Sequence, residues 1–168
     1  MRAQSRALRL NRIDLIQLHT VDPNVPIEES VGALGELQGE GKIRMIGLSN
    51  VNVEQLRRAQ RFARVVSVQN RYSLGDRGSE DVLELCDKEG LAFLPWYPLG
   101  AGSLARVTEI RSETTEAATP AQIALAWLLR CSPVMAPIQG TSSVAHLEEN
   151  VGVAGLRLSD EDFERLSG

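Results

Sequence analysis

The run Ile13-Asp14-Leu15-Ile16-Gln17-Leu18-His19 has the apolar density of a strand buried on both faces of a parallel sheet, and it ends in a histidine. Parallel α/β folds carry their chemistry at the carboxyl ends of their strands. His19 is therefore a candidate functional residue. Its position also matters, because none of the residues before it suits the role of a catalytic partner.

Four further apolar runs follow this pattern, and segments with helical periodicity separate them. Each run is short and bounded by Gly, Pro, Asn or Asp, as expected for a buried strand. We therefore predict strands at residues 13–18, 43–48, 65–69, 91–96 and 134–138. Helices are expected at 26–39, 52–63 and 79–89, from Thr119, from near Val144 and from Ser159, with 104–118 a loop that runs into a short helix.

Local signals mark where several of these helices begin and end. Thr119 can cap a helix, Pro120 fits its first position, and Gln122 completes a capping box. Gly41 and Gly90 follow two other helical patterns, as glycines that end helices do. The chemistry of the helix ends therefore supports boundaries that the periodicity already indicates.

Strands that alternate with helices indicate an α/β protein with a parallel sheet and right-handed crossovers. A doubly wound sheet would normally carry G-x-G-x-x-G after its first strand, but His19-Thr20-Val21-Asp22-Pro23 contains no glycine. Gly100-Ala101-Gly102 has two glycines and no third. We therefore predict an incomplete (β/α)8 TIM-type barrel, since a full barrel needs about 200 to 250 residues. Residues 1–168 are expected to form one domain.

Composition excludes several classes of function. A net charge of −4 gives no support to a nucleic-acid partner, which would leave a basic patch. No apolar run approaches the ~18 residues of a membrane span. Cys86 and Cys131 lie far apart and outside any metal-binding spacing. We therefore expect both to be small core residues of a cytoplasmic protein, with no metal site.

The first twelve residues carry four arginines and no acid, which loosely resembles a transit peptide. The segment is short for a presequence and runs directly into the first strand. We therefore favour the end of a helix, with Leu8 and Leu10 packing inward.

Six segments, in order and at sensible spacings, resemble a known family. They are IDLIQLHTVDP (13–23), GKIRMIGLSN (41–50), VVSVQNRYS (65–73), LPWYPLGAGSLA (94–105), TPAQIALAWLL (119–129) and GTSSVAHLEEN (140–150). From about residue 8 to 167 the chain looks like the C-terminal two thirds of an aldo-keto reductase barrel, truncated at the N-terminus. The resemblance implies that its strands are barrel strands four to eight. It also implies NADP(H)-dependent reduction of aldehydes or ketones to alcohols, with NAD(H) the less expected cofactor.

The resemblance assigns roles to residues at the strand ends. His19 matches the catalytic histidine that orients the carbonyl oxygen of a small-molecule substrate. Ser49, Asn50 and Gln69 match the residues that contact the nicotinamide carboxamide, where an amide side chain can both donate and accept. Trp96 matches the aromatic residue that stacks on the nicotinamide ring. The alternatives are a structural histidine, ordinary turn chemistry and a core tryptophan, respectively.

The resemblance also places the phosphates of the cofactor. Leu99 and Gly100 match the loop that passes the pyrophosphate, where backbone N–H groups can approach. Hydroxyls precede a helix N-terminus, which is a ready anion site. That segment matches the site of the 2′-phosphate and adenine of NADP, through Gly140, Thr141, Ser142, His146, Glu149 and Asn150. His146 stands where an arginine is common, which weakens the preference for NADP over NAD. The alternative is a simple serine cap of the helix.

Some groups that the resemblance implies find no match here. The family's proton donor is a tyrosine, tuned by a lysine and an aspartate, on strands that precede the one ending in His19. No Tyr, Lys or Asp precedes Asp14, and Tyr72 and Tyr97 fall in later loops. We therefore expect the chain to carry one of the four catalytic groups.

Two other interpretations stay open. One is a non-catalytic nicotinamide-dinucleotide-binding or interaction module, which keeps the cofactor site and lacks the Asp, Tyr and Lys. The other is a different barrel enzyme with a phosphate site, which would explain residues 140–143 but not Ser49, Asn50 and Gln69. An unclosed barrel also has open edge strands and exposed apolar faces. A homo-oligomer that covers the open sheet edges is one expected consequence.

Overall fold

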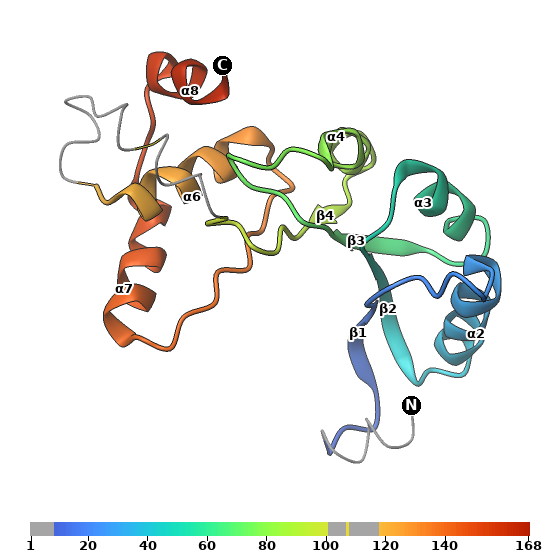
Figure 1. Ribbon diagram of the computed structural model, residues 1–168. Coiled ribbons are helices and arrows are strands. Elements are labelled where there is room, and N and C mark those ends of the chain that lie inside the picture. Colours follow the sequence, from blue (N-terminus) through green and yellow to red (C-terminus); the bar gives the residue numbers. More distant parts are fainter. Residues whose placement is uncertain (1–8, 101–106, 108–117) are drawn as a thin grey trace.

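The computed structural model describes residues 9–100, 107 and 118–168 of the chain. Four parallel strands form one sheet in the order of the sequence (Figure 1): β1 (Ile13–Leu18), β2 (Ile43–Ser49), β3 (Val65–Gln69) and β4 (Ala92–Phe93). The crossover helices α2 (Ile27–Gly39), α3 (Val53–Ala59) and α4 (Glu80–Glu89) lie along one side of this sheet. The α/β class and the incomplete barrel predicted from the sequence are confirmed.

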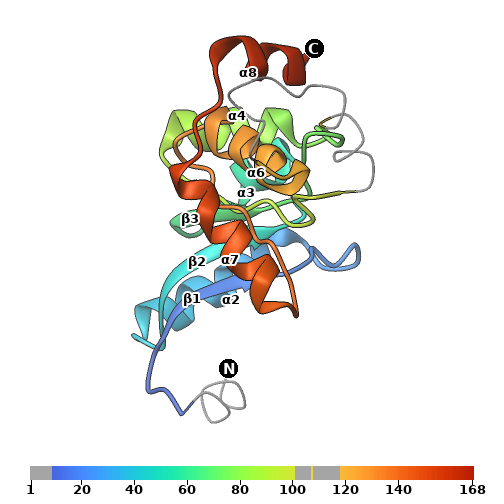
Figure 2. The same cartoon turned by 90° about the vertical axis from the view of Figure 1, so that its left-hand side faces the viewer.

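The second half of the chain adds three helices beyond the sheet. They are α6 (Pro120–Cys131), α7 (Val144–Gly152) and α8 (Asp160–Ser167), with the short 3-10 helix η2 (Val153–Gly155) after α7. In the turned view, α7 runs across the front and α8 lies at the top (Figure 2). The side chains of Trp127 and Phe163 stack at 6.2 Å between ring centres, which packs α8 against α6.

The predicted fourth and fifth strands are less regular than expected. β4 is two residues long, although residues 91–96 were predicted. Segment 134–138 joins it through isolated parallel bridges, Phe93 to Met135 and Trp96 to Ile138. The Phe93 and Ala136 amides donate across this boundary at 2.8 Å each. Pro95, Pro133 and Pro137 lack an amide hydrogen, so they interrupt the ladder.

Most of the predicted helix ends are confirmed. Thr119 and Gln122 form the expected capping box on α6, and the Ser159 hydroxyl caps α8. Gly41 and Gly90 both have positive φ, at 74° and 66°. α3 ends at Ala59, earlier than the predicted residue 63, because the chain tightens there into i→i−3 hydrogen bonds.

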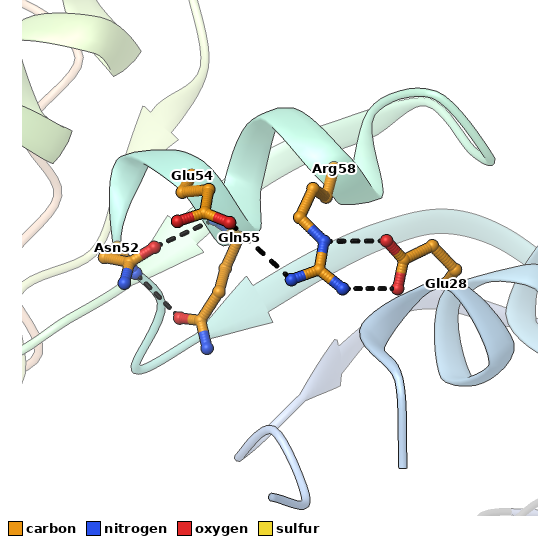
Figure 3. Close-up of polar contacts among 5 residues, drawn as sticks. All are labelled: Glu28, Asn52, Glu54, Gln55 and Arg58. Atoms are coloured by element: carbon orange, nitrogen blue, oxygen red, sulfur yellow. Dashed lines mark hydrogen bonds and ion pairs between the residues drawn. The ribbon is translucent and has the colours of Figure 1, made fainter.

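The shorter α3 places one predicted core residue outside. Phe62, which was expected on the apolar stripe of that helix, is 53% exposed. At the other end of the helix, the sequence analysis missed a second capping box, which Asn52 and Gln55 make. Figure 3 shows both partners at the start of α3. α3 is therefore fixed at its N-terminus by side chains and closed by a turn.

An ion pair between neighbouring helices ties α3 to α2 (Figure 3). Arg58 donates from Nε to Glu28 Oε1 at 2.7 Å and from Nη2 to Glu28 Oε2 at 2.9 Å. The two parallel bonds match the fork of the guanidinium to the carboxylate. Hydrogen bonding to Arg58 lowers the pKa of the Glu28 carboxyl. This pair fixes the spacing of the first two crossover helices on the outer face of the sheet.

The N-terminal expectation is corrected in one respect. Residues 1–8, and with them Leu8, lie outside the described residues. Residues 9–12 are not helical, and Leu10 is 48% exposed, so the predicted inward packing of Leu10 is wrong. The segment predicted as a loop and short helix at 104–118 also lies outside the described residues, except for Val107 and Ala118.

Both cysteines pack as expected against the core. Cys86 on α4 is fully buried, and Cys131 at the end of α6 is partly buried against the same cluster. Burial raises the pKa of each thiol to about 12. Neither group is poised as a thiolate at neutral pH.

Gln17, Gly47 and Ser67 lie next to one another on three adjacent strands of the sheet. Gln17 of β1 donates from Nε2 to Ser67 Oγ of β3 at 3.0 Å, across the position of Gly47 in β2. A Cβ at residue 47 would lie 2.1 Å from Gln17 Oε1 and 2.3 Å from Ser67 Oγ. Glycine is required there because this hydrogen bond crosses directly over its Cα.

We predict that Gly47→Ala lowers the free energy of unfolding by about 1–3 kcal/mol, because the added methyl group displaces Gln17 and Ser67. Gly32→Ala is the matched control. Gly32 lies inside α2, and a Cβ there meets no atom within 4 Å, so the change is expected to raise stability by up to about 1 kcal/mol. Urea unfolding followed by circular dichroism measures both. Equal effects at the two positions would contradict the explanation.

Candidate cofactor-binding site

Five predicted site residues come together at the carboxyl ends of the strands. His19 follows β1, Ser49 ends β2 and is followed by Asn50, Gln69 ends β3, and Trp96 lies shortly after β4. Because the strands are parallel and adjacent in sequence order, these ends lie along one edge of the sheet. His19 and Asn50 are exposed there, whereas Ser49 is buried.

Asn50 connects three of these strand ends. Its Nδ2 donates to the carbonyl oxygen of His19 at 3.0 Å, and its Oδ1 accepts from Trp96 Nε1 at 3.0 Å. Its backbone amide donates to the carbonyl oxygen of Gln69 at 3.1 Å. The residue has a φ of 58°, a left-handed conformation that asparagine tolerates better than most residues. This turn directs the amide side chain along the edge of the sheet rather than into solvent.

The hydroxyl of Ser49 is already used within the protein. It donates to the carbonyl oxygen of Gln69 at 2.7 Å, which ties the ends of β2 and β3 together. The Ser49 hydroxyl oxygen in turn accepts a hydrogen bond from Asn50 Nδ2 at 3.3 Å. The Gln69 side chain is half-buried at this position. A ligand that reaches this edge would therefore meet an ordered pair of strand ends rather than loose turns.

Asn70 is a central residue of the edge that the sequence analysis missed. Its side chain is 4% exposed. Its Oδ1 accepts from the Val51 amide at 3.1 Å, and its Nδ2 donates to the Val51 carbonyl oxygen at 2.7 Å and to Ser79 Oγ at 3.3 Å. Its own carbonyl oxygen accepts from the Trp96 amide at 3.0 Å. Asn70 therefore holds the loop after Asn50, the start of α4 and the backbone of Trp96.

Arg71 is a second residue that the sequence analysis missed. Its guanidinium lies 5.9 Å from the ring centre of Trp96 and 5.2 Å from that of Tyr97. Asp76 holds it from the other side, with 2.8 Å between Nε and Oδ2. A cation over these two rings limits their motion. The sequence does place this arginine close to the site, because Arg71 follows Gln69, the last residue of β3, by two positions.

The two tyrosines differ in their surroundings. Tyr72 is buried, and its hydroxyl donates to Glu80 Oε2 at 2.7 Å. Burial and this hydrogen bond raise the pKa of the Tyr72 phenol, so it is held as a neutral donor within the core. Tyr97 is 50% exposed beside Trp96. The Tyr72 hydroxyl is therefore engaged within the core, whereas the Tyr97 ring is open to solvent.

A second group of predicted residues lines one cavity of about 230 Å³. Its lining residues are Leu99, Ala121, Gly140, Thr141, His146, Glu149 and Asn150. Five of the six residues predicted for the adenine end therefore meet there, together with Leu99 from the predicted pyrophosphate loop. Ser142 is exposed and does not line this cavity. Gly100 is buried, where a Cβ would lie 3.1 Å from the Tyr97 ring.

Two of the hydroxyl groups before α7, those of Thr141 and Ser143, accept hydrogen bonds from backbone amides at the start of the helix. Ser143 Oγ accepts from the His146 amide at 3.4 Å, so the simple serine cap that the sequence left open is present. Thr141 Oγ1 accepts from the Ser143 amide at 3.1 Å, and Thr141 still lines the cavity. The earlier amides of the helix lack intrahelical partners, as at any helix N-terminus. The cap and the cavity therefore occupy the same turn.

Glu149 and Asn150 fix α7 against the start of α6. The Thr119 hydroxyl donates to Glu149 Oε1, and Gln122 Nε2 donates to the Glu149 carbonyl oxygen at 3.0 Å. Asn150 lines the cavity although it is only 7% exposed. The capping box that starts α6 therefore also positions the acidic residue of the cavity.

Two absences concern only the part of the chain that the structure describes. Within residues 9–100, 107 and 118–168, no three side chains of the His, Cys, Asp or Glu type gather as a metal site would require. Within the same ranges, no helix has the length and apolar character that crossing a bilayer demands.

Comparison with known proteins identifies one family. The family model "Aldo/keto reductase family" matches residues 1–116 and 105–168. An uncharacterized oxidoreductase of Schizosaccharomyces pombe is 47% identical over 164 residues, which is 96% of this chain and 53% of that protein. Pyridoxine 4-dehydrogenase of Escherichia coli is 38% identical over 175 residues, which is 97% of this chain and 59% of that protein.

A solved structure agrees with these sequence matches. The aldo/keto reductase of Klebsiella pneumoniae in complex with NADP and acetate superposes with a TM-score of 0.86 at 28% identity, over 98% of this chain and 61% of that one. The chain thus spans little more than half the length of the curated relatives it matches.

We predict that Asn70→Ala lowers the free energy of unfolding by about 2 kcal/mol, because it leaves buried backbone groups of Val51 without partners. Asn24→Ala is the matched control, since Asn24 is exposed and bonds only to Asp22 nearby; its expected effect is within about 0.5 kcal/mol. Urea unfolding compares the two. Equal stabilities would contradict the role given to Asn70.

Proposed function

Because this chain belongs to the aldo/keto reductase family, we propose that it provides the cofactor site of an NADP(H)-dependent reductase that converts aldehydes or ketones to alcohols. The observation that carries the proposal is the hydrogen-bonded link from His19 through Asn50 to Trp96. A histidine, an amide and an aromatic ring are thereby held at one edge of the sheet. Direct hydrogen bonds among these residues hold the group together.

The strand-end residues would hold the nicotinamide. Trp96 offers a broad ring face whose tilt is set by Asn50 at its Nε1 and by Arg71 over its face. Gln69 presents an amide that can both donate to and accept from a carboxamide. Ser49 is fixed by its bond to the Gln69 carbonyl oxygen and offers an acceptor. When bound, the reduced cofactor supplies the hydride.

The cavity beside α7 would hold the adenine end. Its walls combine the free amides of a helix N-terminus with the Thr141 hydroxyl, His146 and Asn150. Segment 96–100 leads from the stacking ring to Leu99 on the cavity wall. One extended dinucleotide would therefore run from Trp96 to α7 along this segment. The NADP in the Klebsiella pneumoniae structure supports the same cofactor class for this chain.

His19 would orient the carbonyl oxygen of the substrate. It is exposed at the end of β1, and Asn50 holds its backbone carbonyl. The proposal gives the residues of this chain cofactor binding and carbonyl positioning. It gives proton donation to none of them, since Tyr72 is engaged with Glu80.

The relatives support the reductase over the non-catalytic module. One is described as an oxidoreductase and another as a dehydrogenase. The buried free thiol of Cys86 suits a reducing compartment, which supports placing the protein in the cytoplasm. We also propose that a second copy covers the free edge of β1, which pairs with β2 alone among the strands that the structure describes and carries Leu15 at 38% exposure.

We expect NADPH to bind the purified full chain, with enhancement of nicotinamide fluorescence on titration. Trp96→Ala is expected to weaken binding about tenfold, because it removes the ring face and its stacking energy. Phe62→Ala is the control, since Phe62 is exposed on the turn between α3 and the start of β3, at the opposite end of that strand from Gln69. Absence of NADPH binding by a folded chain would refute the proposed function, and turnover of 4-nitrobenzaldehyde would extend it to catalysis.

For the second copy, gel filtration of the full chain is expected to give the mass of a dimer or larger assembly. Leu15→Lys places a charge at the free edge of β1 and is expected to shift the protein toward monomer. A monomer at all concentrations in the unmodified protein would refute this part of the proposal.

A further inference from the structure

Two neighbouring cavities lie along α6. The larger, of about 370 Å³, lies between the last turns of α6 and residues 153–160. The smaller, of about 210 Å³, lies between α6 and the end of α7. Leu129, Val153 and Ala154 line both cavities, so the two form one continuous groove. We call it the α6 groove.

The walls of the α6 groove are mainly apolar. Its smaller cavity is lined by six apolar residues and by Gln139 and Asn150. Leu129 and Val151 line it and are still 43% and 64% exposed. Cavities that bind small molecules combine apolar walls with a few polar groups in this way. Exposed apolar side chains that gather in one place also mark binding surfaces.

The charged side chains of the groove lie at one end. Arg130, Arg157 and Asp160 line the larger cavity, and no charged residue lines the smaller one. Arg130 is already engaged, because it donates to the Leu158 carbonyl oxygen at 2.7 Å and pairs with Asp160. Arg157 is exposed and pairs with no acid among the residues that the structure describes. The larger cavity therefore has a net positive charge, and Arg157 carries it.

We propose that the α6 groove binds a single-chain amphiphilic anion such as a fatty acid. The carboxylate lies at Arg157, and the alkyl chain follows the groove past Leu129 toward Val151. This site goes beyond the proposed cofactor site. Among the described lining residues, Asn150 alone is shared between the α6 groove and the cavity of the adenine end.

The shape and the charge of the groove together select this class of ligand. A compact anion would pair with Arg157 and leave the apolar smaller cavity unfilled. An uncharged chain would fill the apolar walls and leave the arginine without a partner. A monoanion on an alkyl chain meets both conditions. Each CH₂ that the groove fully buries is expected to tighten binding about fourfold.

The test measures binding of dodecanoate to the full chain by isothermal titration calorimetry, below the critical micelle concentration. One molecule per chain is expected. Octanoate is expected to bind at least about tenfold more weakly, because it buries fewer CH₂ groups. Dodecyltrimethylammonium has the same alkyl chain length and the opposite charge, so it is also expected to bind more weakly than dodecanoate.

Two pairs of variants locate the ligand. Leu129→Asp places a charge in the middle of the groove and is expected to weaken dodecanoate binding at least about tenfold. Leu147→Asp is its control, because Leu147 is 51% exposed on α7 and lines neither cavity. Arg157→Glu is expected to lower the affinity ratio of dodecanoate over dodecyltrimethylammonium about fivefold. Arg165→Glu is its control, on the exposed surface of α8.

Circular dichroism checks that each variant is folded. If Leu129→Asp does not fold, Ala154→Phe replaces it, because Ala154 is exposed and lines both cavities, and the larger ring is expected to block the groove.

Three results would overturn the inference. A folded, unmodified chain that does not bind dodecanoate refutes it. Equal affinities of Leu129→Asp and Leu147→Asp place any binding outside the groove. An affinity ratio of the two dodecyl ligands that Arg157→Glu leaves unchanged refutes the position given to the carboxylate. None of these measurements involves NADPH, so the proposed function and this inference can fail separately.

Discussion

The side chain of Asn50 is the interaction on which the candidate site depends. Two 3.0 Å hydrogen bonds from one amide join the end of β1 to the ring that follows β4. These ends lie three strands apart in the sheet, so no backbone ladder connects them directly. The left-handed φ of 58° makes the connection possible, because it turns the side chain along the sheet edge. Strain of this kind persists only where the surroundings hold it.

The buried side chain of Asn70 holds the backbone next to Asn50 in place. It binds both backbone groups of Val51, the residue directly after Asn50, and so fixes the turn that Asn50 makes. Through its carbonyl oxygen it also fixes the backbone of Trp96. The two ends of the bond between Asn50 and Trp96 are therefore set by the same buried residue. An aromatic ring held in this way is preorganised for stacking, which reduces the entropy lost when a ligand binds.

Sequence patterns were sufficient for the elements and for much of the site, and the exceptions have physical causes. Short apolar runs located β1, β2 and β3, because each run is bounded by turn residues. β2 and β3 are largely buried as expected, whereas β1, predicted to be buried on both faces, leaves Leu15 38% exposed because it is the edge strand of the sheet. β4 and segment 134–138 were predicted too regular, although Pro95, Pro133 and Pro137 could have indicated an interrupted ladder. Asn50 was found because it matches a family motif. Asn70 was missed because its partners, Val51 and Ser79, become its neighbours only when the sheet forms.

The cavity beside α7 is held in place by the same bonds that fix the starts of α6 and α7. The segment from Gly140 to Asn150 keeps the helix start, its cap and its acidic residue, and all of these are supported by bonds within the protein. Among the described residues that line the cavity, His146 is the one basic side chain and Glu149 is the one acidic side chain. The caps of the two helices therefore fix the walls of this cavity independently of any ligand.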